Sequence, residues 1–199
     1  GVEQEKVTKP SAQPITIEKQ SVKAARQKVP EQSPPHSSRE PYFIQIGFDF
    51  GTSYSKCICR DLATNKAWVY LPSKADGQEF PFLIPSVLQY KNEKLNVVEN
   101  ASTHYPENGL YHIKQALVKA VQKQWDDPVL VPYRQATGFS ESSALAAFVE
   151  CCGVFYLAKA LGEVRREIRK RLSDFGSLPK DYMAVNLAVP VADAEQPEI

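Results

Sequence analysis

The chain has 199 residues, of which 43% are hydrophobic and 24% are charged, and its formal net charge is +1. These values are typical of a soluble globular protein with one domain, or with one domain and a tail. A nearly neutral chain offers no broad basic surface for DNA or RNA. We therefore expect no nucleic-acid partner.

Signals for membranes and structural metals are weak as well. The N-terminal stretch GVEQEKVTKP lacks the apolar core of a signal peptide, and no run of apolar residues approaches the length of a membrane span. The cysteines stand as Cys57, Cys59 and the adjacent pair Cys151 and Cys152, and neither spacing is a usual zinc pattern. We read them as small buried side chains in a reducing compartment. The expected location is cytoplasmic, with no membrane partner.

The composition changes abruptly near Tyr42. Residues 1–41 are rich in Gln, Lys, Ser and Pro and carry few large apolar side chains. Such a segment buries too little surface to offset its chain entropy, so it is predicted to be a disordered tail or linker. Residues 42–199 form the predicted folded region.

The first half of the folded region is predicted to consist of strands. The apolar run Tyr42–Phe50 is typical of a strand buried on both faces, and the alternating residues Ser55–Asp61 predict its hairpin partner. Lys66–Pro72 is a third short strand, and Pro85–Val98 contains two more, joined near Asn92. The short turns favour an antiparallel meander at the start of a mixed sheet.

Two helices and a further strand are predicted in the second half. The first helix carries an apolar stripe and has Asn108 as candidate N-cap; the second has Ser140 as candidate cap and runs to Leu172. The first stripe is Leu110, Ile113, Leu117, Ala120 and Val121, and the second is Leu145, Phe148, Cys152, Phe155, Ala158, Leu161, Val164, Ile168 and Leu172. Met183–Pro190 is then predicted to be a buried strand. Because such a strand normally feeds further elements, we expect the chain to form the first half of a larger fold.

One polar cluster interrupts the apolar pattern, in the stretch IGFDFGTSYSK. Asp49 lies near the end of a predicted strand, where a carboxylate can hold a hydrated divalent cation. Gly51 permits a tight turn, and the consecutive amides of Gly51, Thr52, Ser53 and Tyr54 can form an anion-holding nest. From these residues alone, a plain β-turn with polar side chains explains the stretch equally well.

This stretch resembles the first phosphate-binding motif of the actin-like ATPases, and most closely that of the 70-kDa heat-shock chaperones. Three later segments resemble other segments of that family in the same order. They are FLIPSVLQY (residues 82–90), YPENGLYHIKQAL (residues 105–117) and VNLAVPVADAEQ (residues 185–196). The resemblance covers about residues 43 to 196. It implies the N-terminal lobe of an actin-like, ribonuclease H-like ATPase domain, with a mixed five-stranded sheet and packed helices.

The resemblance also implies roles for single residues. Asp49 would approach a magnesium ion through water, and Gly51, Thr52, Ser53 and Tyr54 would hold the β- and γ-phosphates of ATP or ADP. Lys114 matches the lysine that reaches the γ-phosphate and its attacking water. Catalysis of this kind is mainly positioning and neutralisation of developing charge. Without the motif, Lys114 would be read as a lysine whose stem lies along the core while its ammonium group reaches water.

Departures from the family are visible. The loop after Pro190 lacks the expected arginine, and residues 122–140 are short where the chaperones have an added hairpin. The second phosphate motif and the adenosine motif of the family have no counterpart in the chain. The sequence therefore predicts part of a divergent chaperone-like ATPase, which alone would not hydrolyse ATP.

The parent protein would couple ATP hydrolysis to a protein client or co-chaperone. Three alternatives remain: an actin-like assembly scaffold, a catalytically inactive nucleotide-binding relative, and a sugar-kinase relative. A scaffold or a sugar kinase would share the hairpin of residues 49–54. The context of Lys114 favours the chaperone-like reading over the scaffold, and the three later segments disfavour the sugar kinase.

Overall fold

The computed structural model describes residues 39–72, 79–98, 106 and 108–188. Most of the predicted tail, and the chain after Ala188 including Pro190, lie outside these residues. The elements in chain order are β1 (Phe43–Asp49), β2 (Tyr54–Asp61), β3 (Lys66–Val69), β4 (Ile84–Pro85), β5 (Leu88–Lys91), β6 (Lys94–Val97), β7 (Gly109–Leu110), α1 (Ile113–Val121), the 3-10 helix η1 (Pro128–Leu130), α2 (Val131–Thr137), α3 (Ser142–Arg171) and β8 (Tyr182–Ala188).

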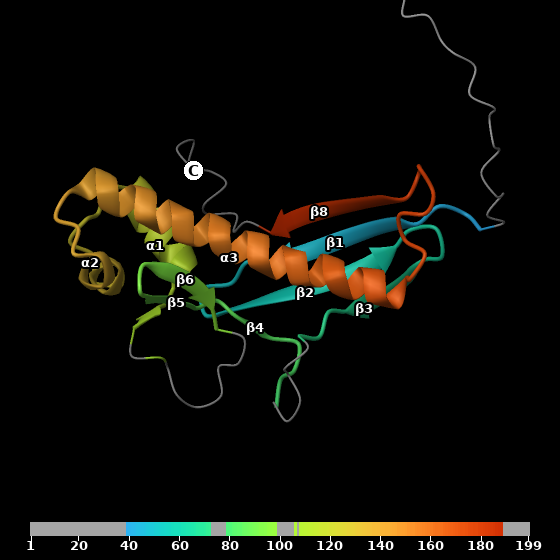
Figure 1. The fold of residues 1–199 in the computed structure, drawn as a ribbon, viewed down its shortest axis with the longest axis horizontal. Helices are drawn as coiled ribbons and strands as arrows, with labels where there is room; N and C mark the ends of the chain where they lie inside the picture. The colour runs from blue at the N-terminus through green and yellow to red at the C-terminus, as the bar shows by residue number, and fades with distance from the viewer. Residues whose placement is uncertain (1–38, 73–78, 99–105, 107, 189–199) are drawn as a thin grey trace, which may run out of the picture. The chain divides into compact units, whose positions relative to one another are not determined.

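The main sheet has five strands in the order β3-β2-β1-β8, with β4 paired to β2 (Figure 1). Strand β1 is antiparallel to β2 and parallel to β8, so the sheet is mixed. The prediction of an α/β fold with a mixed five-stranded sheet and packed helices is confirmed. Asp49 lies in register with Ala188, so the carboxyl ends of β1 and β8 meet at one edge of the sheet.

The two strands predicted between Pro85 and Val98 form as β5 and β6, but they belong to a second sheet. This sheet has the order β6-β5-β7 and is antiparallel. Asn92 and Glu93 join β5 to β6 with φ angles of 52° and 59°. Two successive residues with positive φ give the tight turn that matches the twist of a hairpin.

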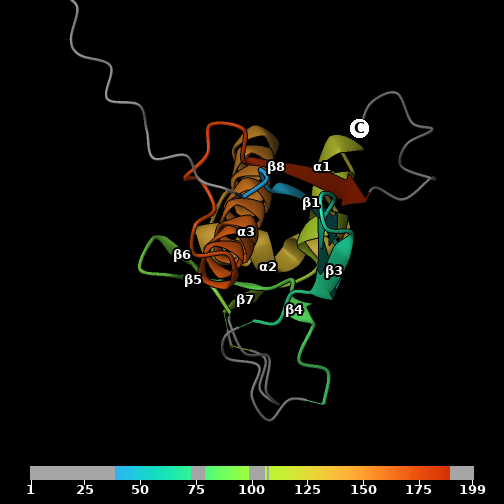
Figure 2. The same ribbon diagram turned by 90° about the vertical axis from the view of Figure 1, so that its right-hand side faces the viewer.

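Helix α3 lies along one face of the main sheet in both views (Figures 1 and 2). Ile44, Ile46 and Phe48 point to that face and pack in one core with buried residues of α3. The alternate side chains of β1, such as Phe43 at 44% exposure, point away from it. The prediction of a strand buried on both faces is therefore wrong for β1, because among the described residues a helix covers only one face.

Strand β8 also differs from the prediction of a buried strand. Its residues are half-buried or exposed, with Val185 at 46% and Leu187 at 44% exposure. Within the described part of the chain, β8 pairs with β1 alone. An edge strand with one neighbour keeps much of its surface in solvent, although its sequence is as apolar as that of a central strand.

The helix starts were predicted imperfectly. Helix α1 begins at Ile113 after His112, and not after Asn108, because Gly109–Leu110 pair with β5 as β7. Helix α3 has Glu141 at its N-cap position, one residue after the predicted Ser140. Ala158 is exposed, and the buried stripe of α3 is Leu145, Val149, Cys152, Gly153, Tyr156, Ala160, Val164 and Ile168.

The first part of α3 is apolar over a long stretch. An 18-residue window has mean hydropathy 1.7, so by length and composition α3 could cross a membrane. Glu150 and Lys159 interrupt this stretch, so it is not an uninterrupted run of apolar residues. The observation is weak evidence, because the core helix of a soluble protein passes the same test of length and composition.

A buried carboxylate joins both ends of the described region. The Asp181 side chain, 1% exposed, accepts hydrogen bonds from the guanidinium of Arg39 at 2.6 and 2.8 Å. It also accepts from the backbone N–H groups of Tyr42, Gly176 and Leu178. These contacts connect Arg39, which precedes Tyr42, to the segment before β8.

These contacts generate a prediction about pH. Hydrogen bonding from Arg39, aided by the backbone donors, lowers the pKa of Asp181. A depressed folded-state pKa stabilises the fold above about pH 4, the range of an unfolded aspartate, and that contribution is lost as pH falls toward the folded-state pKa. We expect Asp181→Asn to lower the free energy of unfolding by about 2 kcal/mol at pH 7, measured by urea denaturation.

The matched control is Asp126→Asn, at an exposed aspartate between α1 and η1. It should change the free energy of unfolding little. An Asp181→Asn variant as stable as the unaltered chain at pH 7, or a deficit that grows as pH falls, would contradict this account of the Asp181 contacts.

Candidate functional site

The polar cluster of the sequence forms the turn between β1 and β2. The Gly51 N–H donates to the carbonyl oxygen of Asp49 at 3.1 Å, which gives a sharp reversal after the strand. A Cβ atom at Gly51 would overlap the carbonyl oxygen of Tyr54. Glycine is therefore required at this position because the backbone of the turn folds back on itself.

Three buried hydroxyl groups fix this turn in place. The Tyr156 hydroxyl of α3 donates to Ser55 Oγ at 2.9 Å, and Ser55 Oγ lies 3.0 Å from Ser86 Oγ. Ser86 Oγ lies 3.3 Å from the Tyr156 hydroxyl and closes the ring. The Ser86 N–H also donates to the carbonyl oxygen of Ser53 at 2.9 Å. The turn is thus attached to α3 and to the segment that follows β4.

Thr52 and Lys114 line the same cavity, although they are far apart in sequence. This cavity of about 380 Å³ is lined by Thr52, Lys114, Gln115, Val118, Lys119, Asp127 and Val129. Lys114 is half-buried, on the first turn of α1. No acceptor contacts its ammonium group among the residues that the structure describes. A half-buried cation and a hydroxyl group on the wall of one cavity are suited to binding an anion.

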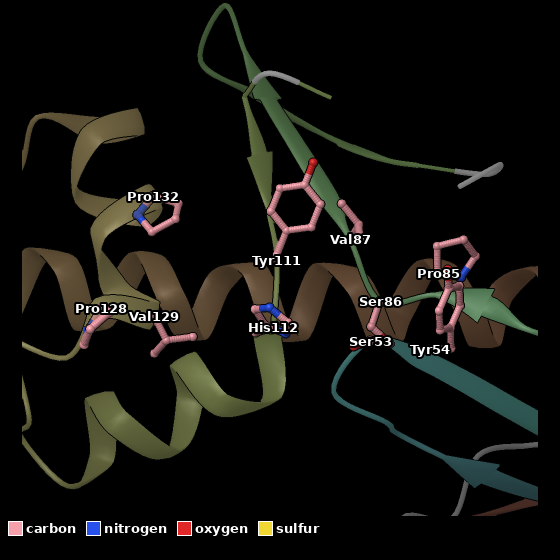
Figure 3. A pocket seen from close by; sticks show the side chains of 10 residues that line it. All are labelled: Ser53, Tyr54, Pro85, Ser86, Val87, Tyr111, His112, Pro128, Val129 and Pro132. Atoms are coloured by element: carbon pink, nitrogen blue, oxygen red, sulfur yellow. The ribbon is translucent and has the colours of Figure 1, made fainter. Parts of the chain in front are cut away.

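Ser53 and Tyr54 line a different cavity, of about 400 Å³, shown in Figure 3. Its walls are mainly apolar, and Val129 lines both cavities, so the two are neighbours. The structure therefore brings Thr52 together with Lys114, whereas Ser53 and Tyr54 face the adjoining space.

His112 is a cavity residue that sequence reasoning missed. It lines the second cavity and has a left-handed φ of 54°, unusual for a residue other than glycine. Its position depends on the turn from β7 into α1, where the Tyr133 hydroxyl donates to the Tyr111 carbonyl oxygen at 2.8 Å. No sequence pattern indicates that backbone angle.

Asp49 is exposed at the carboxyl end of β1. Among the described residues, no group of three or more His, Cys, Asp or Glu side chains is placed to hold a metal ion. This arrangement fits Mg²⁺ only as an ion that keeps several waters and shares its other ligands with phosphate, which is its usual mode. Asp49 is the one predicted site residue that could hold it.

No family model, no curated protein and no solved structure matches the chain.

The close approach at Gly51 can be tested by adding one methyl group. Gly51→Ala should displace the turn and lower the free energy of unfolding by about 1–3 kcal/mol, the usual cost of overpacking. The matched control is Gly47→Ala on β1, where the nearest atom to a new Cβ is the Ile58 carbonyl oxygen at 3.8 Å. Urea denaturation of both variants checks this. Equal effects would show that the turn is not constrained at Gly51.

Proposed function

We propose that the chain is the N-terminal, phosphate-binding lobe of an actin-like ATPase similar to the 70-kDa heat-shock chaperones. The parent protein would bind Mg-ATP between two lobes and couple its hydrolysis to a protein client or co-chaperone in the cytoplasm. The observation that carries this proposal is the shared cavity of Thr52 and Lys114, in which the ammonium group has no anionic partner among the described residues.

The state of Lys114 supports an anionic ligand. An ammonium group that has lost part of its water is stabilised by an acceptor that compensates for the lost hydrogen bonds. The other cavity lysine, Lys119, has such acceptors, whereas Lys114 has none within the described residues. A phosphate group between Thr52 and Lys114 would supply the missing charge.

The position of the turn in the sheet supports the same proposal. Ligands of open α/β sheets bind beyond the carboxyl ends of the strands. The turn follows the carboxyl end of β1, which is aligned with the end of its parallel neighbour β8. Segments that resemble the chaperone family meet at this turn, since the Ser86 N–H donates to the Ser53 carbonyl oxygen and Lys114 lines the same cavity as Thr52.

In this proposal each residue has a limited chemical task. Lys114 neutralises charge on the terminal phosphate, Thr52 donates a hydrogen bond, and Gly51 allows the backbone to come close. Asp49 would orient water bound to Mg²⁺, which supplies charge neutralisation at the phosphates. Because phosphoryl transfer requires mainly positioning, one lobe can bind phosphate without catalysing hydrolysis.

Calorimetric titration of the 199-residue chain with Mg-pyrophosphate tests the proposal. Lys114→Gln should weaken binding by at least about tenfold, because hydrogen bonds to charged groups contribute roughly 1.5–3 kcal/mol. The matched control is Lys94→Gln, at an exposed lysine of β6. The proposal fails if the unaltered chain binds no pyrophosphate, or if both variants bind it as the unaltered chain does.

A further inference from the structure

A second lysine lies on the wall of the same cavity. Lys119 is on the last turn of α1, and its side chain is 32% exposed. Its ammonium nitrogen lies 3.2 Å from Asp127 Oδ2 and 2.7 Å from Gln124 Oε1. An ammonium group has three donors. These two contacts leave one donor for another acceptor, so Lys119 can bind a ligand without releasing its neighbours.

Asp127 holds its place through the start of η1. Its Oδ1 accepts from the Val129 N–H at 3.0 Å, as expected of an N-cap residue, and its Oδ2 faces Lys119. The hydrogen bond from Val129, together with Lys119, lowers the pKa of Asp127, so the carboxylate is charged at neutral pH. The cavity wall thus carries two ammonium groups and one carboxylate.

We infer that Lys119 is a second phosphate-contacting cation of this cavity, and that Asp127 positions it while reducing the positive charge available to an anion. The inference rests on the proposed function and deepens it. Two cations on the wall of one cavity suit a chain of linked phosphates, so the site would bind pyrophosphate or triphosphate in preference to a single phosphate. An ion pair that merely joins α1 to η1 would have no such effect.

The roles inferred for Lys119 and Asp127 predict opposite changes in the affinity for pyrophosphate when each charge is removed. Lys119→Gln removes a cation and should weaken the binding of pyrophosphate by about fivefold, whereas Lys119→Arg keeps the charge and should bind nearly as the unaltered chain does. Asp127→Asn removes the opposing charge but keeps a good N-cap residue. It should strengthen the binding of pyrophosphate by about threefold.

The experiment is calorimetric titration of the 199-residue chain and these variants with pyrophosphate and with inorganic phosphate, at one fixed ionic strength. Asp126→Asn is the control for Asp127→Asn, since it removes an exposed neighbouring charge that does not line the cavity. Thermal melts confirm that each variant is folded. Lys119→Gln should also reduce the preference for pyrophosphate over phosphate.

The outcomes separate this inference from the proposed function. If Lys114→Gln weakens binding but Lys119→Gln and Asp127→Asn do not change it, the proposed function stands and the second cation is refuted. If Asp127→Asn weakens binding in a folded variant, its role as an opposing charge is wrong. If the unaltered chain binds neither probe, both the function and the inference fail.

Discussion

The ring of hydroxyl groups formed by Ser55, Ser86 and Tyr156 is the interaction on which the candidate site depends. All three residues are buried. Leaving any one of the hydroxyl groups without a hydrogen-bond partner would lower the free energy of unfolding by about 1–3 kcal/mol. Phe50 stacks on the Tyr156 ring at 5.5 Å, so residues on both sides of the turn contact the same side chain. One turn earlier on α3, Gly153 approaches Leu117 of α1 so closely that a Cβ would meet it at 2.8 Å. Helix α3 thus supports both the turn with Thr52 and the helix with Lys114.

The partly buried cations of the fold differ in whether acidic side chains are paired with them. Lys119 is paired with Asp127 and Gln124, and Arg39 is paired with Asp181 and Asp174. Lys114 is half-buried without such a partner among the described residues, in contact with the same space as Thr52. Of Lys114, Lys119 and Arg39, only Lys114 has no acidic partner among the described residues. We propose an actin-like ATPase lobe from this contrast and from the motif resemblance together.

Much of the fold could be predicted from sequence because it depends on local patterns. The alternation of Ser55–Asp61 indicated β2, and the spacing of apolar residues indicated helices α1 and α3. The predicted burial of both faces of β1 and of strand β8 was wrong, because burial depends on residues distant in sequence. Both strands have sequences as apolar as those of buried strands. The start of α1 after His112, and not after Asn108, follows from the pairing of β7 with β5.

In the candidate site, the order of the motifs suggested Thr52 and Lys114. Nothing in the sequence indicated the ion pair of Lys119 with Asp127, because a contact between the end of α1 and η1 depends on the path of the chain between them.

The central claim is that the turn after β1 and the start of α1 together hold a metal-bound polyphosphate. The most direct test replaces Mg²⁺ with paramagnetic Mn²⁺ and records the amide signals of the labelled chain by NMR as Mn-pyrophosphate is added. The account predicts that signals of residues 49–54 and of the first turn of α1 broaden first, and that diamagnetic Mg-pyrophosphate shifts the same signals without broadening them. Broadening centred instead on the acidic side chains of α3, such as Glu163 and Glu167, or spread evenly over the chain, would contradict it.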